Sequence, residues 1–290
     1  MTSVVVGAGR SADVEQAGPS AGRETLLRAG GGLFAVIVLA GLLAPLLSPY
    51  DPIAQLPRES LLPPGSPGHM LGTDQFGRDI YTRCLYAIRL DLFIGIVGVL
   101  LPLILGTALG AIAGYLRGWP ELIIMRTLDV VTAFPYLVML IALVAVLGPS
   151  LLNLFVALTA SGWTTYARLV RGEMLVVREH EYILAAEGLG LGRRRVLLGH
   201  LIPNVISPAL VFAMADVVLT ILFAASLSFL GLGVQPPTPE WGQMIHEGQS
   251  FILGAWWLVT FPGLFIVATG VALSMLGDGI ADRIRVGGRT

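Results

Sequence analysis

The sequence contains no lysine, and all eighteen of its basic residues are arginine. A conventional P-loop holds nucleotide phosphates with the lysine of a Gly-Lys-Ser/Thr run, so this chain is not a conventional P-loop ATPase. Catalysis through a Schiff base is excluded as well, because it needs a lysine amine. Cys84 is the only cysteine, which excludes an internal disulfide and any CxxC metal or redox motif.

Signatures of enzymes and metal sites are also missing. The four histidines, His69, His180, His200 and His246, do not have the spacing of metal ligands. Neither HExxH nor GxSxG occurs. We therefore predict no catalytic, cofactor-binding or metal-ligating residue on this chain, and we do not expect it to be an enzyme.

Charge is scarce along the whole chain. Only 13% of the 290 residues are charged, against about a quarter in a typical soluble domain. Hydrophobic residues make up 55% of the chain, and the mean hydropathy is +0.79. This composition indicates that lipid surrounds much of the surface. The net charge of −1 gives no bulk attraction to nucleic acid.

Six stretches are long and apolar enough to cross a bilayer, which takes about 20 residues each. The sequence therefore predicts an all-α membrane protein with about six transmembrane helices. The expected spans are residues 29–48, 92–115, 128–147, 151–170, 205–230 and 256–276. In this division residues 1–28 and 277–290 are tails, residues 49–91 are a loop with a short helix, and residues 92–276 are a core with five of the spans.

The placement of the arginines predicts the orientation. With the N-terminus in the cytoplasm, fourteen of the eighteen arginines fall on the cytoplasmic side, and only Arg58, Arg78, Arg83 and Arg89 fall outside. The positive-inside rule then places both termini in the cytoplasm. A cleaved signal peptide within residues 1–48 is the competing interpretation. It is disfavoured because the charged region is long and the apolar run exceeds a typical signal core.

The loop before the second predicted span carries a motif of charged residues and glycines. We expect Thr73 or Asp74 to cap a short helix at the outer membrane surface. The pairs Asp74/Arg78 and Asp79/Arg83 would then lie four residues apart with the acid first, which is the favourable order. The alternative is a solvated helix start that these charges merely decorate. The residues of this outer-loop motif are His69, Gly72, Thr73, Asp74, Gly77, Arg78 and Asp79.

A polar segment, residues 179–203, lies between the fourth and fifth predicted spans. The pattern predicts two helices, 179–187 and 193–201, separated by Gly188, Gly190 and Gly192 and ended by Pro203. The small residues Ala185 and Ala186 let a partner surface approach closely. The alternative is an interfacial loop whose arginines only obey the positive-inside rule. That alternative does not explain the Ala-Ala-x3-Gly pattern.

Two acidic residues, Asp129 and Asp216, fall within predicted spans. Such a charge at the centre of a bilayer costs about 2.5–3.5 kcal/mol on insertion scales, so each should face the bundle interior or water. They are candidates for contact with a transported substrate, and hydrogen bonding between helices is the alternative. After the fifth span, Trp241, Trp256 and Trp257 suit the membrane interface.

Three motifs resemble the permease subunits of dipeptide/oligopeptide/nickel ABC importers, specifically the C-type subunit. The outer-loop motif is similar to the family's H-x-L-G-T-D-x-x-G-R-D. The run Ala185-Ala186-x3-Gly190-x9-His200-Leu201-Ile202-Pro203 is similar to the EAA loop, E-A-A-x3-G-x9-I-x-L-P, of binding-protein-dependent importers in general. Residues 227–242 are close to L-S-F-L-G-L-G-x-Q-P-P-x-P-x-W-G. The resemblance spans roughly residues 26–285.

The resemblance implies a type I ABC importer permease fold in a bacterial inner membrane. The chain would pair with a homologous second permease and receive short peptides from an extracytoplasmic binding protein. Two separate ATPase subunits or domains would bind ATP and Mg²⁺. The segment 179–203 would dock on them through Glu181, Tyr182, Ala185, Ala186, Glu187, Gly190, Arg193 and Pro203. Nickel and glutathione importers share the scaffold, so the substrate stays open.

Two positions depart from the family pattern. Leu184 stands where the EAA motif has glutamate, so Glu181 or Glu187 would have to supply the acidic contact with the ATPase. Ala224 stands where relatives often carry an acidic residue. A secondary transporter without an ATPase is a further alternative, but it predicts inverted repeats that are not clear in this sequence.

Overall fold

The computed structural model describes the backbone of residues 21–287, and the side chains of residues 26–280 except Leu184, Ala186, Glu187, Arg193, Arg194 and His200. Most of the predicted N-terminal tail thus lies outside the described range. Within that range the chain is helical, with only isolated β-bridges. The longer helices are α1 (Ala21–Leu42), α3 (Ile80–Leu116), α4 (Trp119–Thr132), α5 (Tyr136–Leu147), α6 (Leu151–Val177), α9 (Ile202–Phe229) and α11 (Trp257–Gly287). The shorter ones are α2 (Ala44–Leu47), α7 (Glu181–Gly188), α8 (Arg193–Val196), α10 (Trp241–Gly248), the 3₁₀ turns η1 (Pro57–Glu59) and η3 (Gln249–Phe251), and the π-helical turn η2 (Leu197–Leu201).

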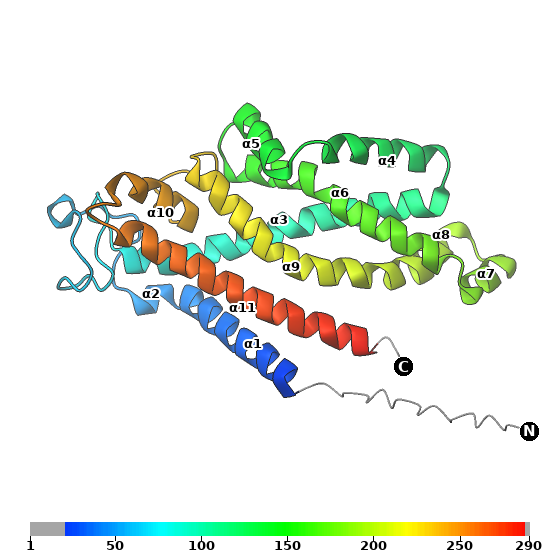
Figure 1. Cartoon of the computed structure of the whole chain (residues 1–290), viewed down its shortest axis with the longest axis horizontal. Helices are drawn as coiled ribbons and strands as arrows, with labels where there is room; N and C mark the ends of the chain where they lie inside the picture. Colours follow the sequence, from blue (N-terminus) through cyan, green and yellow to red (C-terminus); the bar gives the residue numbers. More distant parts are fainter. Residues whose placement is uncertain (1–20, 288–290) are drawn as a thin grey trace, which may run out of the picture.

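Helices α3, α6 and α9 pack against one another in the centre of the bundle, and α1 and α11 lie side by side along one flank (Figure 1). Gly106 and Gly110 of α3 approach α6 closely. A β-carbon on either glycine would collide with the α6 main chain, at the carbonyls of Trp163 and Ala167. Small residues of this kind let helices pack tightly in a membrane, where no hydrophobic force drives them together.

Three of the described helices are long and apolar enough to cross a membrane: α3, α9 and the Trp257–Ile280 part of α11. Helices α4 and α5 qualify only as a pair, which is bent by 90°. The stretch predicted as the span 128–147 therefore forms two helices that meet at Pro135. The helix breaks before Pro135, because proline has no N–H for a helical hydrogen bond and disfavours helical geometry at Phe134. The total of six spans stays a prediction.

Two other helix boundaries differ from the expectation. Helix α3 begins at Ile80, well before the predicted start at residue 92. The second helix of the 179–203 segment does not stop before Pro203, but continues through η2 into α9. Pro203 lies in the first turn of α9, and the wide π-turn before it relieves the clash between the proline ring and the preceding carbonyl.

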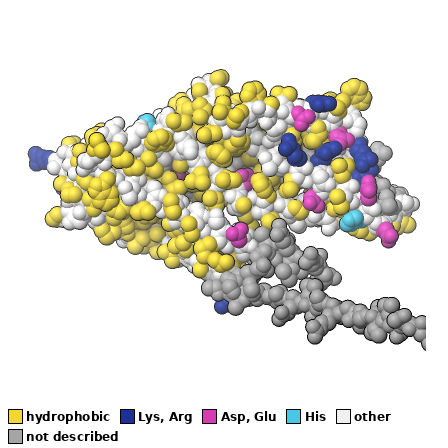
Figure 2. All heavy atoms as spheres, in the orientation of Figure 1, with side chains coloured by type: hydrophobic (Ala, Val, Ile, Leu, Met, Phe, Trp, Pro, Cys, Tyr) yellow, Lys and Arg dark blue, Asp and Glu magenta, His cyan; other side chains and the backbone are white. Residues whose placement is uncertain are grey.

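The two ends of the bundle carry different structures. The irregular segment 48–79 and α10 lie at one end, whereas α7, α8, the start of α1 and the end of α11 lie at the other (Figure 1). The face in Figure 2 is largely hydrophobic between these ends, and most of its arginines lie toward the end that carries α7 and α8. An extended exposed apolar surface marks contact with a membrane or a protein partner.

Candidate functional site

The outer-loop motif forms an irregular loop and not the short helix expected from its sequence. The cap of α3 is Asp79, whose carboxylate accepts hydrogen bonds from the N–H and the hydroxyl of Thr82 at 2.8 and 2.6 Å. Asp74 accepts bonds from the backbone N–H groups of Phe76 and Arg78 at 2.8 and 2.9 Å. Such local bonds compete with helix formation. The predicted N-cap at Thr73 or Asp74 is therefore wrong.

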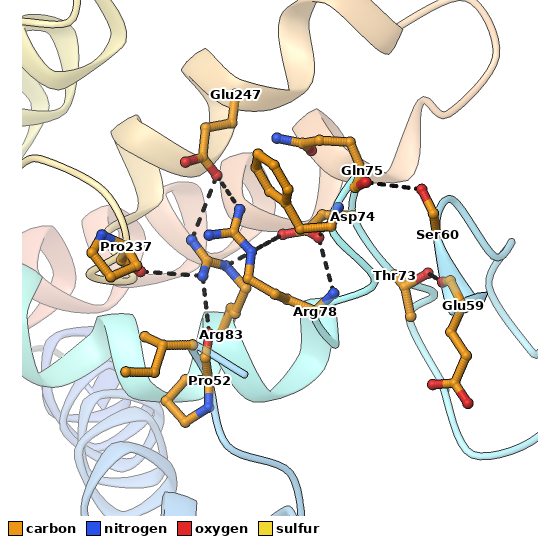
Figure 3. Close-up of polar contacts among 12 residues, drawn as sticks. Pro52, Glu59, Ser60, Thr73, Asp74, Gln75, Arg78, Arg83, Pro237 and Glu247 are labelled. Carbon is orange, nitrogen blue, oxygen red and sulfur yellow. Dashed lines mark hydrogen bonds and ion pairs between the residues drawn. The ribbon is translucent and has the colours of Figure 1, made fainter. Parts of the chain in front are cut away.

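Two arginines of this region are buried and share the same acidic partners (Figure 3). The Arg78 guanidinium lies 2.5 Å from Asp74 and 2.5 Å from Glu247 of α10. The Arg83 guanidinium lies 3.9 and 3.6 Å from the same two carboxylates and also donates to two loop carbonyls. We call these four residues the ionic cluster. Its ion pairs connect the loop and the start of α3 to α10, which is far away in the sequence.

His69 joins the same loop to the start of α3. Its Nδ1 atom lies 3.0 Å from Asp79, and its Nε2 atom lies 3.1 Å from Glu59. A neutral imidazole donates from one nitrogen only, so both bonds to carboxylates form only with the protonated ring. Burial lowers the pKa of His69, but the hydrogen bonds and charges of Asp79 and Glu59 outweigh burial and raise this pKa above its usual value.

We expect the His69 bridge to make stability depend on pH. Because the folded-state pKa is raised, the stabilisation is fully present below the unfolded pKa of 6.5 and is lost as pH rises through the folded pKa. In detergent, the difference in thermal unfolding midpoint between wild type and His69→Gln should therefore shrink across that window. The control His180→Gln, at an exposed position, should keep the wild-type pH profile. A wild-type profile for His69→Gln would contradict the bridge.

The remaining residues of the outer-loop motif set the shape of the loop. Gly77 has φ of +75° and packs against the Leu56 carbonyl, where there is no room for a side chain. Gly72 shares the left-handed geometry, with φ of +80°. The Thr73 carbonyl accepts a hydrogen bond from the indole N–H of Trp257 at 3.1 Å. Within this chain the motif is thus a packing framework that joins the loop to α11.

Sequence reasoning missed three acidic residues that hold this end together: Asp91, Glu240 and Glu247. Glu240 caps α10 by accepting two backbone N–H bonds at 2.9 and 2.7 Å, and Asp91 accepts a 3.3 Å bond from the N–H of Trp241. Burial raises the pKa of Glu240, and the two backbone bonds offset part of that effect. Trp241, expected at the membrane interface, is fully buried. Asp91 interrupts an apolar run. Because a charged residue in such a run usually has a polar partner, the sequence could have predicted that Asp91 is hydrogen-bonded.

The 179–203 segment forms two short helices at the opposite end of the bundle (Figure 1). The turn between them contains Gly190 with φ of +79°, so the predicted glycine break is confirmed. Ile183 of α7 is 1% exposed and packs in an apolar cluster with side chains of α6 and α9. Of the residues predicted to dock on the ATPase, Glu181, Tyr182 and Ala185 lie on α7 and are exposed. The side chains of Ala186, Glu187 and Arg193 lie outside the described residues.

The two acidic residues proposed for a pathway are not brought together. Asp129 lies on α4 with its side chain 59% exposed, 3.7 Å from Arg126. Asp216 of α9 is partly buried and accepts a 2.7 Å hydrogen bond from the Tyr166 hydroxyl of α6. This bond fits the alternative of packing between helices, and a pathway role for either residue stays a prediction. Among the described residues, no cluster of three or more His, Cys, Asp or Glu side chains could hold a metal ion.

Comparison with known proteins identifies the family. The family of binding-protein-dependent transport system inner membrane components matches residues 106–286, and the N-terminal transmembrane domain of oligopeptide transport permease C matches residues 23–64. The chain is 42% identical to the dipeptide transport system permease protein DppC of Alkalihalophilus pseudofirmus, over 85% of this chain and 81% of the relative. This chain belongs to the binding-protein-dependent transport permeases.

Two further relatives and one solved structure extend this result. The permease is 40% identical to the di/tripeptide transport system permease protein DppC of Pseudomonas aeruginosa, over 88% of this chain and 86% of the relative. It is 41% identical to the glutathione transport system permease protein GsiD of Pectobacterium atrosepticum, over 87% of this chain and 84% of the relative. It resembles the inward-facing MetNI methionine ABC transporter with a TM-score of 0.55 and 17% identity, over 70% of this chain and 96% of that chain. The predicted family and the type I ABC importer fold are confirmed.

The permease is therefore a multi-pass membrane protein and a subunit of an ABC importer that works with other transporter subunits. Its two candidate sites lie at opposite ends of the bundle (Figure 1). The ionic cluster orders one end, and helices α7 and α8 form part of the other.

Proposed function

We propose that this permease pairs with a homologous second permease to form the path through which short peptides enter a bacterial cell across its inner membrane. Two of the relatives named above are permeases of dipeptide and di/tripeptide transport systems, and they match most of the chain. A binding protein delivers the peptide at the end formed by segment 48–79 and α10. ATP and Mg²⁺ bind to two separate ATPase subunits, and this chain has no ATPase site of its own.

The position of α7, with Glu181, Tyr182 and Ala185 exposed, is the observation that carries this proposal. Ile183 anchors α7 between α6 and α9, while α8 runs through η2 into α9 without a break. A force applied to α7 is therefore transmitted to two long helices of the bundle core. Docking of an ATPase on the exposed residues of α7 would couple its closure to rotation of α6 and α9. This motion would open the path alternately to the two sides.

The sidedness of α7 and α8 tests the proposal. Cys84 is buried, so a cysteine introduced at the surface can be labelled selectively. Leu189 is 84% exposed in the α7–α8 turn, and Met70 is 61% exposed at the opposite end. An impermeant maleimide should label Met70→Cys in intact spheroplasts and Leu189→Cys only in inside-out vesicles. Labelling of Leu189→Cys from outside would overturn the docking of cytoplasmic ATPases on this segment.

Glutathione is a second candidate substrate. The GsiD relative is as similar to the permease as the two DppC relatives. The complete importer in vesicles, supplied with ATP, should accumulate labelled dialanine or trialanine if peptides are its cargo, and labelled glutathione if the second candidate is right. Uptake driven by an ion gradient without ATP would instead support a secondary transporter.

A further inference from the structure

A cavity of about 260 Å³ lies where the chain breaks between α4 and α5, and α6 supplies its third wall. One water molecule needs only about 10–15 Å³ of such space, so the cavity is large enough for a ligand of many atoms. Every polar side chain in its lining is a hydroxyl, and no charged side chain takes part. The hydroxyl residues are Thr132, Tyr136, Ser161, Thr164 and Thr165.

Ser161 is the unusual member of this lining. It is 3% exposed, and its hydroxyl has no hydrogen-bond partner. Its neighbours are already engaged: the Thr164 hydroxyl donates to the Ser161 carbonyl at 3.1 Å, and the Thr132 hydroxyl donates to the Leu128 carbonyl at 2.9 Å. An unpaired buried hydroxyl is unfavourable. A ligand that offers a polar group inside the cavity removes this penalty.

The broken helix pair supplies further polar groups. Pro135 is the N-cap residue of α5, and its side chain does not accept a hydrogen bond. The N–H groups in the first turn of α5 therefore have no side-chain cap at this position. Irregular backbone at membrane depth is tolerated where it is buried in protein or lines a cavity. In transporters, discontinuous helices of this kind form binding sites for substrates and ions. The break and the orphan hydroxyl of Ser161 border the same cavity.

We propose that this cavity is a substrate-contact site in the transport path, and that its hydroxyls bind the uncharged N–H and C=O groups of a peptide. The proposal rests on the proposed function, because it takes peptides as the cargo. Ser161 is the central contact, since its hydroxyl is free to donate and to accept. Without charged lining residues the cavity does not pair with peptide termini or charged side chains. It therefore senses amide bonds and tolerates different side chains.

Removal of the central hydroxyl tests the contact. In the complete importer in vesicles, Ser161→Ala should slow ATP-driven uptake of dialanine and trialanine by roughly three- to tenfold, the range expected for one lost hydrogen bond. Ser161→Thr keeps the hydroxyl and should retain more uptake than Ser161→Ala. The matched control is Ser226→Ala on α9, where the hydroxyl bonds only its own helix at the Leu222 carbonyl, and it should leave uptake near wild type. Equal uptake by Ser161→Ala and Ser226→Ala would overturn the contact.

Protection of a thiol separates a substrate site from a structural role. Thr165→Cys places a thiol at an exposed position of the cavity, and Thr127→Cys places one on α4 outside it. During ATP-driven uptake of trialanine, labelling of Thr165→Cys by a small thiol reagent should slow at least threefold, whereas labelling of Thr127→Cys should not change. An unprotected Thr165→Cys in an importer that takes up trialanine overturns this site alone. Failure of the wild-type importer to take up either peptide overturns the proposed function instead.

Discussion

Replacing Arg78 with methionine is expected to lower the free energy of unfolding by about 3–5 kcal/mol, the usual cost of removing one partner of a buried ion pair. The Arg78 side chain is 1% exposed and lies 2.5 Å from both Asp74 and Glu247, so the substitution leaves two largely buried carboxylates short of a partner. Arg83 does not replace it, because its nitrogens lie 3.9 and 3.6 Å from those carboxylates. The thermal unfolding midpoint in detergent should fall by roughly 10 °C.

Arg126→Met is the matched control for this substitution. The Arg126 side chain is 75% exposed and lies 3.7 Å from Asp129, and an exposed pair of this kind contributes at most about 1 kcal/mol. Its unfolding midpoint should stay close to wild type. Adding Glu247→Gln to Arg78→Met should recover part of the loss, because the uncompensated buried charge is what destabilises the single variant. Equal midpoints for Arg78→Met and Arg126→Met would show that the ionic cluster does not hold the loop on α10.

The fold class followed from features that are local in the sequence. A bilayer requires long apolar stretches, and such stretches are visible without knowledge of their neighbours. The break between α7 and α8 was expected for a similar reason, because several glycines between two helical patterns end a helix in most contexts. Family membership rested on three short motifs, and it is confirmed by matches over most of the chain.

The features that were missed depend on contacts between distant residues. Aspartate commonly caps a helix, but Asp74 accepts hydrogen bonds within its own loop and forms ion pairs with two arginines. The partner of those arginines, Glu247, lies on α10, and no local pattern marks it. The break at Pro135, by contrast, has a local signal in the proline itself. Tertiary packing decides which polar groups are paired. The hydrophobic periodicity of the sequence carries no information about those pairs.

Gly190→Val is expected to reduce ATP-driven peptide uptake about tenfold while leaving the unfolding midpoint of the bundle near wild type. Gly190 has φ of +79°, and a β-branched residue is strongly disfavoured there. The left-handed conformation costs roughly 1–2 kcal/mol for a residue with a β-carbon, and about 1.4 kcal/mol shifts an equilibrium tenfold. A β-carbon at this position would have no atom within 4 Å, so the effect comes from the backbone and not from a clash.

Gly192→Val provides the control in the same turn. A β-carbon on Gly192 would also meet open space, but the φ of this residue is not in the left-handed range, so valine should leave uptake close to wild type. ATPase subunits retained on the tagged permease and ATP hydrolysed per peptide are measured together for both variants. Because Ile183 still anchors α7 in Gly190→Val, we expect retained ATPase subunits and more ATP spent per peptide. Unchanged uptake in Gly190→Val would mean that force reaches α9 by a route other than the α7–α8 turn.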